Sequence, residues 1–248
     1  MNQQMKDYLP ELSVVIPVHN EADNIRPLVG EIRAALDGLL EYEIVYVDDG
    51  SSDATLQRLI ELRSEFPRPR LLCHERSCGQ STAVLTGVRA ARASWIATLD
   101  GDGQNDPADI PALLAARGDA AAPRGPQLIC GYRRRRKDNW LKRLSSRVAN
   151  RVRSSLLRDH TPDTGCGLKL FKRDTFLALP HFDHMHRFLP ALVLRGGGQI
   201  ACVEVNHRPR VHGKSNYGLH NRLWVGIIDM FGVMWLQRRI KLPVILER

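Results

Sequence analysis

The first half of the chain alternates short apolar runs with longer segments whose apolar residues recur at helical spacing. Runs at 13–18, 43–47, 70–73 and 95–99 are short and bounded by turn residues, as buried strands are. After the first run, one helical face is formed by Ile25, Leu28, Val29, Ile32 and Leu36. A second helix is marked by Leu56, Leu59 and Ile60. This alternation predicts an α/β fold with a mainly parallel central sheet and helices on both faces.

Carboxylates follow three of the predicted strands directly. They belong to Glu21, the pair Asp48 and Asp49, and the pair Asp100 and Asp102. Ligands of open α/β sheets bind outside the carboxyl ends of the strands, so these clusters are expected to line one cleft. Such a cleft repels anions unless a cation or hydrogen-bond donors of the ligand neutralise it. A nucleotide, with its ring and ribose donors and a metal on its diphosphate, fits this cleft, whereas a bare phosphate does not.

The run that ends at Leu99 continues as Asp100-Gly101-Asp102-Gly103-Gln104. Strand alternation places the two carboxylates on one side, and the glycines allow a tight turn with room for a bulky ligand. Two carboxylates with an amide oxygen two residues on suit Mg²⁺ or Mn²⁺. The alternative is a polar turn in which Asp106 caps a helix that has Pro107 at its first position. The short motif alone does not decide between them.

Composition places the chain among globular proteins. Of its 248 residues, 43% are hydrophobic and 25% charged, which suffices for one large α/β domain with an appendage. Five cysteines without C-x-x-C spacing indicate reduced thiols in the cytosol and no zinc site. Residues 1–8 are polar, so no signal peptide is expected.

Positive charge is concentrated in one segment. Residues 133–158 hold eleven Lys and Arg and one acidic residue, whereas the whole chain has a net charge of +9. Within this segment, residues 140–157 are predicted to form a helix, on which Arg143, Arg147 and Arg151 lie four residues apart. It indicates a surface for phosphates of nucleic acid, of an anionic membrane or of a substrate, or else a solvated helix face. Nucleic acid is disfavoured because only two aromatic residues flank the segment.

The second half is less regular. We expect a turn-rich loop over 161–167, a strand through Phe171, a short helix over 187–194 and a strand over 200–205. An apolar stretch, 223–236, would span about 21 Å as a helix, short of the ~30 Å bilayer core. It fits a helix lying in the membrane interface, docked on a partner, or packed on its own domain.

Five ordered segments resemble family 2 glycosyltransferases with a GT-A fold. They are 14–21 (VVIPVHNE), 47–53 (VDDGSSD), 100–104 (DGDGQ), 163–169 (DTGCGLK) and 207–217 (HRPRVHGKSNY). The last two resemble the dolichol-phosphate mannosyltransferase-like branch, which includes bacterial enzymes that load sugars onto undecaprenyl phosphate. The resemblance implies a catalytic domain over 1–217, followed by an amphipathic, membrane- or partner-associating helix over 218–248.

The resemblance also implies roles for matching residues. The divalent metal, Mg²⁺ or Mn²⁺, would be held against the donor diphosphate by Asp100, Asp102 and Gln104. A UDP- or GDP-sugar would contact Pro17, Val18, Asn20, Glu21, Asp48, Asp49, Gln80 and Gly101. Donor phosphates would be approached by Arg208, counted with the catalytic residues, and by Lys214. Phosphate near the acceptor would meet Arg133, Arg143 and Arg147.

Two acceptor classes stay open. A polyprenyl phosphate, whose second pKa is near ~6, is already a nucleophile, so the reaction would need positioning and charge screening. The resemblance implies that the reaction inverts the anomeric centre, in keeping with a single displacement. A saccharide or glycolipid hydroxyl would need a general base, for which Asp163 is the candidate. Gly79-Gln80 and Gly103 depart from the eukaryotic-type mannosyl enzymes, which puts GDP-mannose in question as the donor.

Many relatives carry paired C-terminal transmembrane helices, which this sequence does not show. The resemblance therefore implies a peripheral protein on the cytoplasmic face of the membrane. It would reach lipid directly or through a small membrane subunit.

Overall fold

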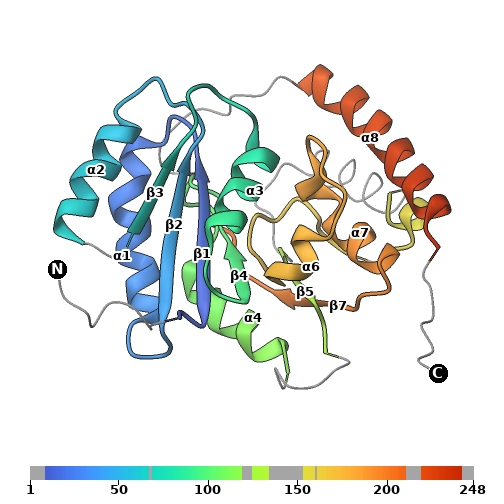
Figure 1. Ribbon diagram of the computed structural model, residues 1–248, viewed down its shortest axis with the longest axis horizontal. Coiled ribbons are helices and arrows are strands. Elements are labelled where there is room, and N and C mark those ends of the chain that lie inside the picture. The colour runs from blue at the N-terminus through green and yellow to red at the C-terminus, as the bar shows by residue number, and fades with distance from the viewer. Residues whose placement is uncertain are drawn as a thin grey trace, which may run out of the picture.

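A central sheet organises the part of the chain that the computed structural model describes, residues 9–66, 69–118, 125–133, 153–159, 161–210 and 219–241. The sheet has seven strands in the order β3-β2-β1-β4-β6-β5-β7 (Figure 1). They are β1 (Leu12–Val18), β2 (Tyr42–Asp48), β3 (Pro69–Cys73), β4 (Trp95–Thr98), β5 (Leu128–Tyr132), β6 (Lys169–Lys172) and β7 (Ile200–Glu204).

Most neighbouring strands run parallel, as predicted. Strands β3, β2, β1 and β4 are parallel to one another, and β5 is parallel to β7. The exception is β6, which pairs antiparallel with both β4 and β5. Because Thr98 at the end of β4 pairs with Lys169 at the start of β6, the loop before β6 reaches the edge where β4 ends.

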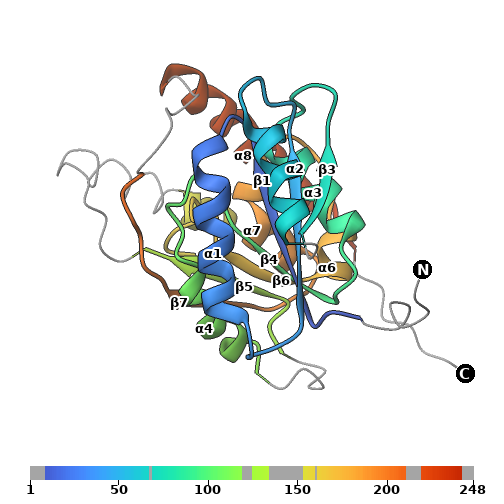
Figure 2. The same cartoon turned by 90° about the vertical axis from the view of Figure 1, so that its left-hand side faces the viewer.

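Helices cover both faces of the sheet (Figures 1 and 2). They are α1 (Ile25–Leu36), α2 (Thr55–Glu65), α3 (Gln80–Ala90), α4 (Ile110–Ala116), α6 (Arg173–Leu177), α7 (Leu189–Arg195) and α8 (Leu219–Arg239). One hydrophobic core joins alternate β1 residues such as Val14 and Ile16 to α1, α2 and α4. The other contains Val15 of β1 and the inner faces of α3, α6 and α7. Strand alternation thus divides the apolar side chains between the two helical layers.

The predicted buried face of α1 is confirmed, since Ile25, Leu28, Val29, Ile32 and Leu36 are all buried. In α2 the face is rotated by about one residue from the predicted markers. Leu59 is buried, but Leu56 is 37% and Ile60 57% exposed, while Thr55 and Leu62 face the sheet. Residues i, i+4 and i+7 share a helical face, and the apolar residues next to that face remain in solvent.

One side of α8 packs on the domain. Val233 is fully buried, Arg195 Nε donates to the Leu236 carbonyl, and Gln237 Nε2 donates to the Leu157 carbonyl. The opposite side leaves four apolar residues exposed, Val225, Ile228, Phe231 and Trp235. Among the described helices, none is both long and apolar enough to cross a bilayer. The domain division at 217/218 stays a prediction, as does the basic helix over 140–157, of which 153–157 is helical and the rest lies outside the described residues.

A glycine sets how closely α3 can approach the sheet. A Cβ on Gly87 would lie 2.4 Å from Val15 Cγ1 and 3.2 Å from Val47 Cγ2. We therefore expect Gly87→Ala to lower the free energy of unfolding by about 1–3 kcal/mol through overpacking. Urea denaturation measures this. The matched control is Gly30→Ala on the exposed side of α1, where nothing lies within 4 Å and a gain of about 0.5–1 kcal/mol is expected. Equal effects of the two substitutions would contradict the close approach.

Candidate active site at the carboxyl edge of the sheet

The predicted acidic clusters meet at one edge of the sheet. Val18, the last residue of β1, pairs with Asp48, the last residue of β2, and the Asp49 N–H donates to the Val18 carbonyl. On the other side of β1, Val15 pairs with Thr98 of β4, two residues before Asp100. The register therefore brings the ends of β1, β2 and β4 side by side. The three clusters therefore share one edge of the sheet, and the predicted cleft would lie between them.

The loops after β1 and β2 are tied to each other. Asn20 adopts a left-handed conformation with φ of 59°, and its Oδ1 accepts hydrogen bonds from the N–H groups of Ser52 and Asp53. The Asn20 N–H in turn donates to Ser51 Oγ, and Asp48 Oδ1 accepts from the Ser51 N–H. Asn20 and Asp48, both predicted to meet the nucleotide, thus also shape the loops beside the cleft.

Asp49 anchors the loop between β3 and α3. It is 4% exposed, and each carboxylate oxygen has two partners. Oδ1 pairs with His74 Nδ1 at 2.6 Å and accepts from the Cys78 N–H, whereas Oδ2 accepts from Ser77 Oγ and the Gly79 N–H. Burial favours the protonated acid, but these hydrogen bonds outweigh it and lower the pKa of Asp49.

Asp49, His74 and Cys78 also hold ligand-type atoms within 4.8 Å of one another. His74 Nε2 is engaged by Thr86 Oγ1, and both Asp49 oxygens are occupied as described above. The group therefore works as a hydrogen-bonded clamp on the β3–α3 loop. The clamp sets the position of Gln80, the first residue of α3, beside Asp100.

Asp100 of the 100–104 motif lies beside the 163–169 motif and beside Gln80, the first residue of α3. Its Oδ1 accepts a hydrogen bond from Gln80 Nε2 at 2.7 Å, and its N–H donates to Asn105 Oδ1. A Cβ on Gly167 would lie 2.1 Å from Oδ2, so only glycine lets this loop approach the carboxylate. Burial, and next the charge of Asp102, raise the pKa of Asp100 against the opposing effect of Lys169.

Gly101 packs closely against the end of β1. A Cβ on Gly101 would lie 2.5 Å from Val18 Cγ1 and 3.1 Å from the Pro17 carbonyl oxygen. Pro17, Val18 and Gly101, all predicted to meet the nucleotide, are thus packed together at the edge of β1. Gln104 follows, with its N–H donating to Asp102 Oδ1 at 3.1 Å.

Arg133 and Asp163 form a buried ion pair. Arg133 Nε and Nη2 donate to the two Asp163 oxygens at 2.6 and 3.0 Å, and the Gly165 N–H also donates to Oδ1. The Arg133 side chain is 10% and the Asp163 side chain 9% exposed. Asp163 therefore serves as a counter-ion that fixes the 163–167 loop beside Asp100. Arg133 is predicted from the sequence to meet the acceptor phosphate, but its Nε and Nη2 donors are engaged by the Asp163 carboxylate.

Two arginines from the segment after β7 reach the acidic loops. A bridge between Asn105 and His207 and a hydrogen bond from the Arg208 N–H to the Gln104 carbonyl join the segment to the loop after β4. The Arg208 guanidinium pairs with Glu31 and Asp106. Arg210 Nη2 instead contacts Asp102 Oδ2 at 2.8 Å and Glu21 Oε1 at 3.3 Å.

Sequence reasoning singled out Arg208 and missed Arg210. The available signal was spacing, because residues two apart in an extended segment point to the same side. The side chain of Asp106, predicted in the alternative reading to cap a helix before Pro107, does accept from the Ala108 N–H. The cap of the alternative reading is therefore confirmed, whereas the metal ligands Asp100, Asp102 and Gln104 stay a prediction. The predicted site residues Arg143, Arg147 and Lys214 lie outside the described residues.

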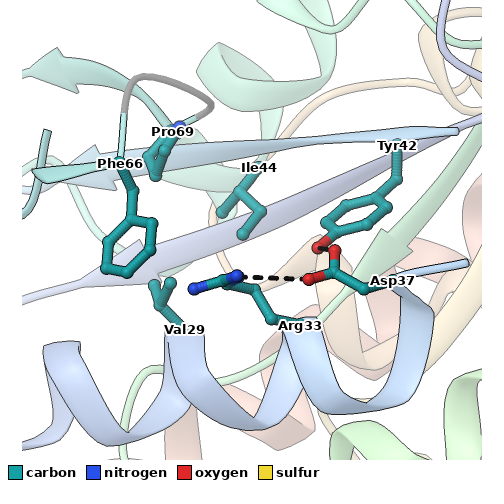
Figure 3. Close-up of a pocket in the computed structure, with 7 residues that line it drawn as sticks. All are labelled: Val29, Arg33, Asp37, Tyr42, Ile44, Phe66 and Pro69. Atoms are coloured by element: carbon teal, nitrogen blue, oxygen red, sulfur yellow. Dashed lines mark hydrogen bonds and ion pairs between the residues drawn. The ribbon is translucent and has the colours of Figure 1, made fainter.

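A separate hollow of about 250 Å³ lies at the opposite edge of the sheet (Figure 3). Tyr42 and Pro69, the first residues of β2 and β3, line it together with Val29, Ile44 and Phe66. Its polar groups are Arg33 and Asp37, which pair with each other at 3.2 Å, and the Tyr42 hydroxyl, which donates to Asp37 Oδ1. It brings together none of the predicted site residues, so we place the candidate site at the acidic edge.

Comparison with known proteins identifies the family. Residues 13–179 match the family described as glycosyl transferase family 2. The chain belongs to this family. The match contains the first four of the five predicted motifs and all three acidic clusters.

Two curated relatives extend the comparison. The dodecaprenyl-phosphate galacturonate synthase of Rhizobium johnstonii is 35% identical over 92% of this chain and 68% of its own. The undecaprenyl-phosphate 4-deoxy-4-formamido-L-arabinose transferase of Edwardsiella ictaluri is 34% identical over 84% of this chain and 63% of its own. The chain thus spans about two thirds of the length of these relatives.

Solved structures confirm the GT-A fold. Glucosyl-3-phosphoglycerate synthase from Mycobacterium tuberculosis, in complex with Mn²⁺, UDP and glucosyl-3-phosphoglycerate, has a TM-score of 0.70. The alignment covers 94% of this chain and 81% of that one at 19% identity. The same enzyme has been solved with Mg²⁺ and UDP, with a TM-score of 0.67.

The hydrogen bonds to Asp49 predict a pH-dependent contribution to stability. Its folded pKa lies below the unfolded value of about 3.9, so the contribution is complete above that value and is lost as pH falls through the folded pKa. We expect Asp49→Asn to cost about 1–3 kcal/mol at pH 7 and progressively less in acid, measured by urea denaturation across pH. Asp174→Asn, at a side chain that is 97% exposed, is the control. A cost of Asp49→Asn that does not change with pH would contradict the role of the charge.

Proposed function

We propose that the protein is a metal-dependent, inverting glycosyltransferase that moves a sugar from a nucleotide-diphospho-sugar to a polyprenyl phosphate. The observation that carries the proposal is the set of groups gathered around Asp100. Gln80 donates a hydrogen bond to its carboxylate, the loop at Gly167 approaches it closely, and the charge of Asp102 acts on it. The names of the two curated relatives, both polyprenyl-phosphate sugar enzymes, support the acceptor class.

The acidic edge fits a divalent cation. Asp100, Asp102 and Gln104 offer hard oxygen ligands of the kind that Mg²⁺ and Mn²⁺ prefer. The structure already places a cation there, since the Arg210 guanidinium bridges Asp102 and Glu21. A bound metal would stabilise the charge that develops on the leaving diphosphate. The structural neighbours crystallised with Mn²⁺ or Mg²⁺ and UDP support this cofactor.

The nucleoside would lie against the paired loops after β1 and β2. Pro17, Val18 and Gly101 form its packed floor, and Glu21 and Asp48 offer acceptors for ring and ribose donors. Asn20 and Asp49 act on this pocket by holding its loops. The donor is a UDP- or GDP-sugar, and UDP is the first to test because the structural neighbours bind it.

The ion pair of Asp163 favours a phosphate acceptor. A hydroxyl acceptor needs a base to take its proton, and the candidate base accepts hydrogen bonds from Arg133 on both oxygens. A phosphate monoester needs no such base near neutral pH, because its second pKa is near ~6. Arg143 and Arg147 are proposed to position this phosphate, together with Arg133. Arg208 and Lys214 are proposed for the donor phosphates.

We further propose peripheral contact with the cytoplasmic face of the membrane through α8. Ile228, Phe231 and Trp235 are 68%, 62% and 59% exposed on one side of this helix. Arg238, Arg239 and Lys241 follow, and the Arg239 guanidinium lies 5.8 Å from the Trp235 ring centroid. Aromatic and basic residues together suit the interface of an anionic bilayer. A small membrane subunit that covers the same face is the alternative.

The activity is tested with a panel of UDP- and GDP-sugars, Mn²⁺ and a short polyprenyl phosphate. We expect transfer from at least one donor and a decrease in kcat of about 10²–10³-fold in Asp102→Ala, because the metal that would stabilise transition-state charge loses a ligand. Asp174→Ala, which deletes a carboxylate with a 97% exposed side chain, is the control. No transfer with any donor, or full transfer by Asp102→Ala, would refute the proposal.

Membrane contact is tested by sedimentation with vesicles that contain anionic lipid. Replacing Phe231 and Trp235 together by serine should weaken binding by about tenfold or more, because both side chains would lose apolar burial. Ile60→Ser, at a residue of α2 that is 57% exposed, should leave binding unchanged. Equal binding of all three proteins would argue against α8 as the contact, and release by salt alone would assign the binding to charge.

A further inference from the structure

Arg210 lies between the carboxylates of Asp102 and Glu21 at the acidic edge and pairs with both. Arg210 Nη2 lies 2.8 Å from Asp102 Oδ2 and 3.3 Å from Glu21 Oε1. The Asp102 and Glu21 side chains are only 13% and 12% exposed, and the Arg210 side chain is 26% exposed. A single guanidinium nitrogen thus screens two partly buried acids that come from the loops after β1 and β4.

The position of Arg210 conflicts with a metal on Asp102. Asp102 Oδ1 already accepts a hydrogen bond from the Gln104 N–H, so Oδ2 is the oxygen that faces the cleft. A divalent ion beside Oδ2 would repel a guanidinium at 2.8 Å. The metal and Arg210 therefore compete for the same carboxylate.

Arg210 is held less firmly than its neighbour Arg208. The Arg208 guanidinium pairs with both Glu31 and Asp106, and the adjoining backbone is joined to residues 104 and 105. Arg210 binds through Nη2, while its Nε is buried without a hydrogen-bond partner among the described residues. A buried donor that lacks a partner weakens the arrangement. The side chain of Arg210 can therefore leave while the segment before it stays anchored.

We propose that Arg210 is a displaceable counter-ion, which occupies the cleft of the donor-free enzyme and leaves when the divalent metal enters with the donor diphosphate. The displaced guanidinium remains next to the cleft, where a diphosphate offers it a bidentate anionic partner. Arg210 is thus a positioning residue that exchanges carboxylates for phosphate. The inference rests on the proposed function in one respect, that the cleft takes a metal ion.

The test measures binding of Mn²⁺ alone to the full chain, without nucleotide, by calorimetry. We expect Arg210→Gln to bind Mn²⁺ about three- to tenfold more tightly than the wild type, because the competing cation is gone. Arg208→Gln removes the same charge two residues away but frees Glu31 and Asp106 instead, so its affinity should stay within about twofold. A tighter affinity cannot arise from damage to the fold, and the thermal midpoint of each variant checks folding independently.

Arg210→Lys adds a second variant that keeps the charge. Its single ammonium lacks the planar fork, so its Mn²⁺ affinity should lie between those of the wild type and Arg210→Gln. Mn²⁺ should also raise the thermal midpoint of Arg210→Gln more than that of the wild type, since tighter binding to the folded state stabilises it more.

The outcomes separate this inference from the proposed function. If Asp102→Ala abolishes Mn²⁺ binding but Arg210→Gln binds no more tightly than the wild type, the counter-ion role is wrong and the metal site stands. An equal gain in Arg208→Gln and Arg210→Gln would also refute it, because net charge alone would explain the effect. If Asp102→Ala binds Mn²⁺ as well as the wild type does, both the metal site and the inference fail.

Discussion

Five carboxylates at one edge of a sheet repel one another, and the architecture depends on how each is compensated. Asp49 is satisfied by backbone and side-chain donors, and the loop it holds carries Gln80 to Asp100. Asp48 receives the Ser51 N–H, which ties its turn to Asn20. Glu21 and Asp102 share the guanidinium of Arg210 instead. The hydrogen-bond donors to Asp48 and Asp49 fix the loops at this edge. Arg210, by contrast, is proposed to move away and free Asp102 for a ligand.

This difference separates two acidic residues that look alike in the sequence. Asp49 and Asp102 each follow a buried strand and a neighbouring carboxylate. The Asp49 oxygens are occupied by four protein groups, whose loss would open the β3–α3 loop. Asp102 keeps one oxygen toward the cleft, and the partner of that oxygen is a side chain that can turn away. Asp49, whose oxygens all have protein partners, therefore holds the loops of the site. Asp102, with one oxygen paired only to a side chain, is the residue proposed to bind a ligand.

Much of this arrangement could be predicted from the sequence, and the failures have physical causes. Periodicity identified the strands and the buried face of α1, because burial on one face of a helix leaves a regular pattern. A short apolar strand carries no mark of its direction, so the reversal of β6 that brings Gly167 to Asp100 was not predictable. Arg208 and Arg210 are equivalent by spacing, and only the packing against Glu31 separates them. The face of α2 depends on which residue starts the helix.

The net charge around Asp102 is compatible with the proposed replacement of Arg210 by a divalent metal. Near the cleft, the carboxylates of Glu21, Asp100 and Asp102 oppose the cations of Arg210 and Lys169. A divalent metal that arrives with a diphosphate adds two charges of each sign and leaves that balance unchanged, provided that Arg210 stays nearby. Arg133 forms an ion pair with Asp163, so the two side chains together add little net charge near Asp100. An incoming acceptor phosphate would then meet an edge that is still negative, the more so because Asp48 and Asp49 lie at the same edge. The screening of that phosphate has to come from further cations. We propose that the basic segment of residues 133–158, with its eleven Lys and Arg, supplies them.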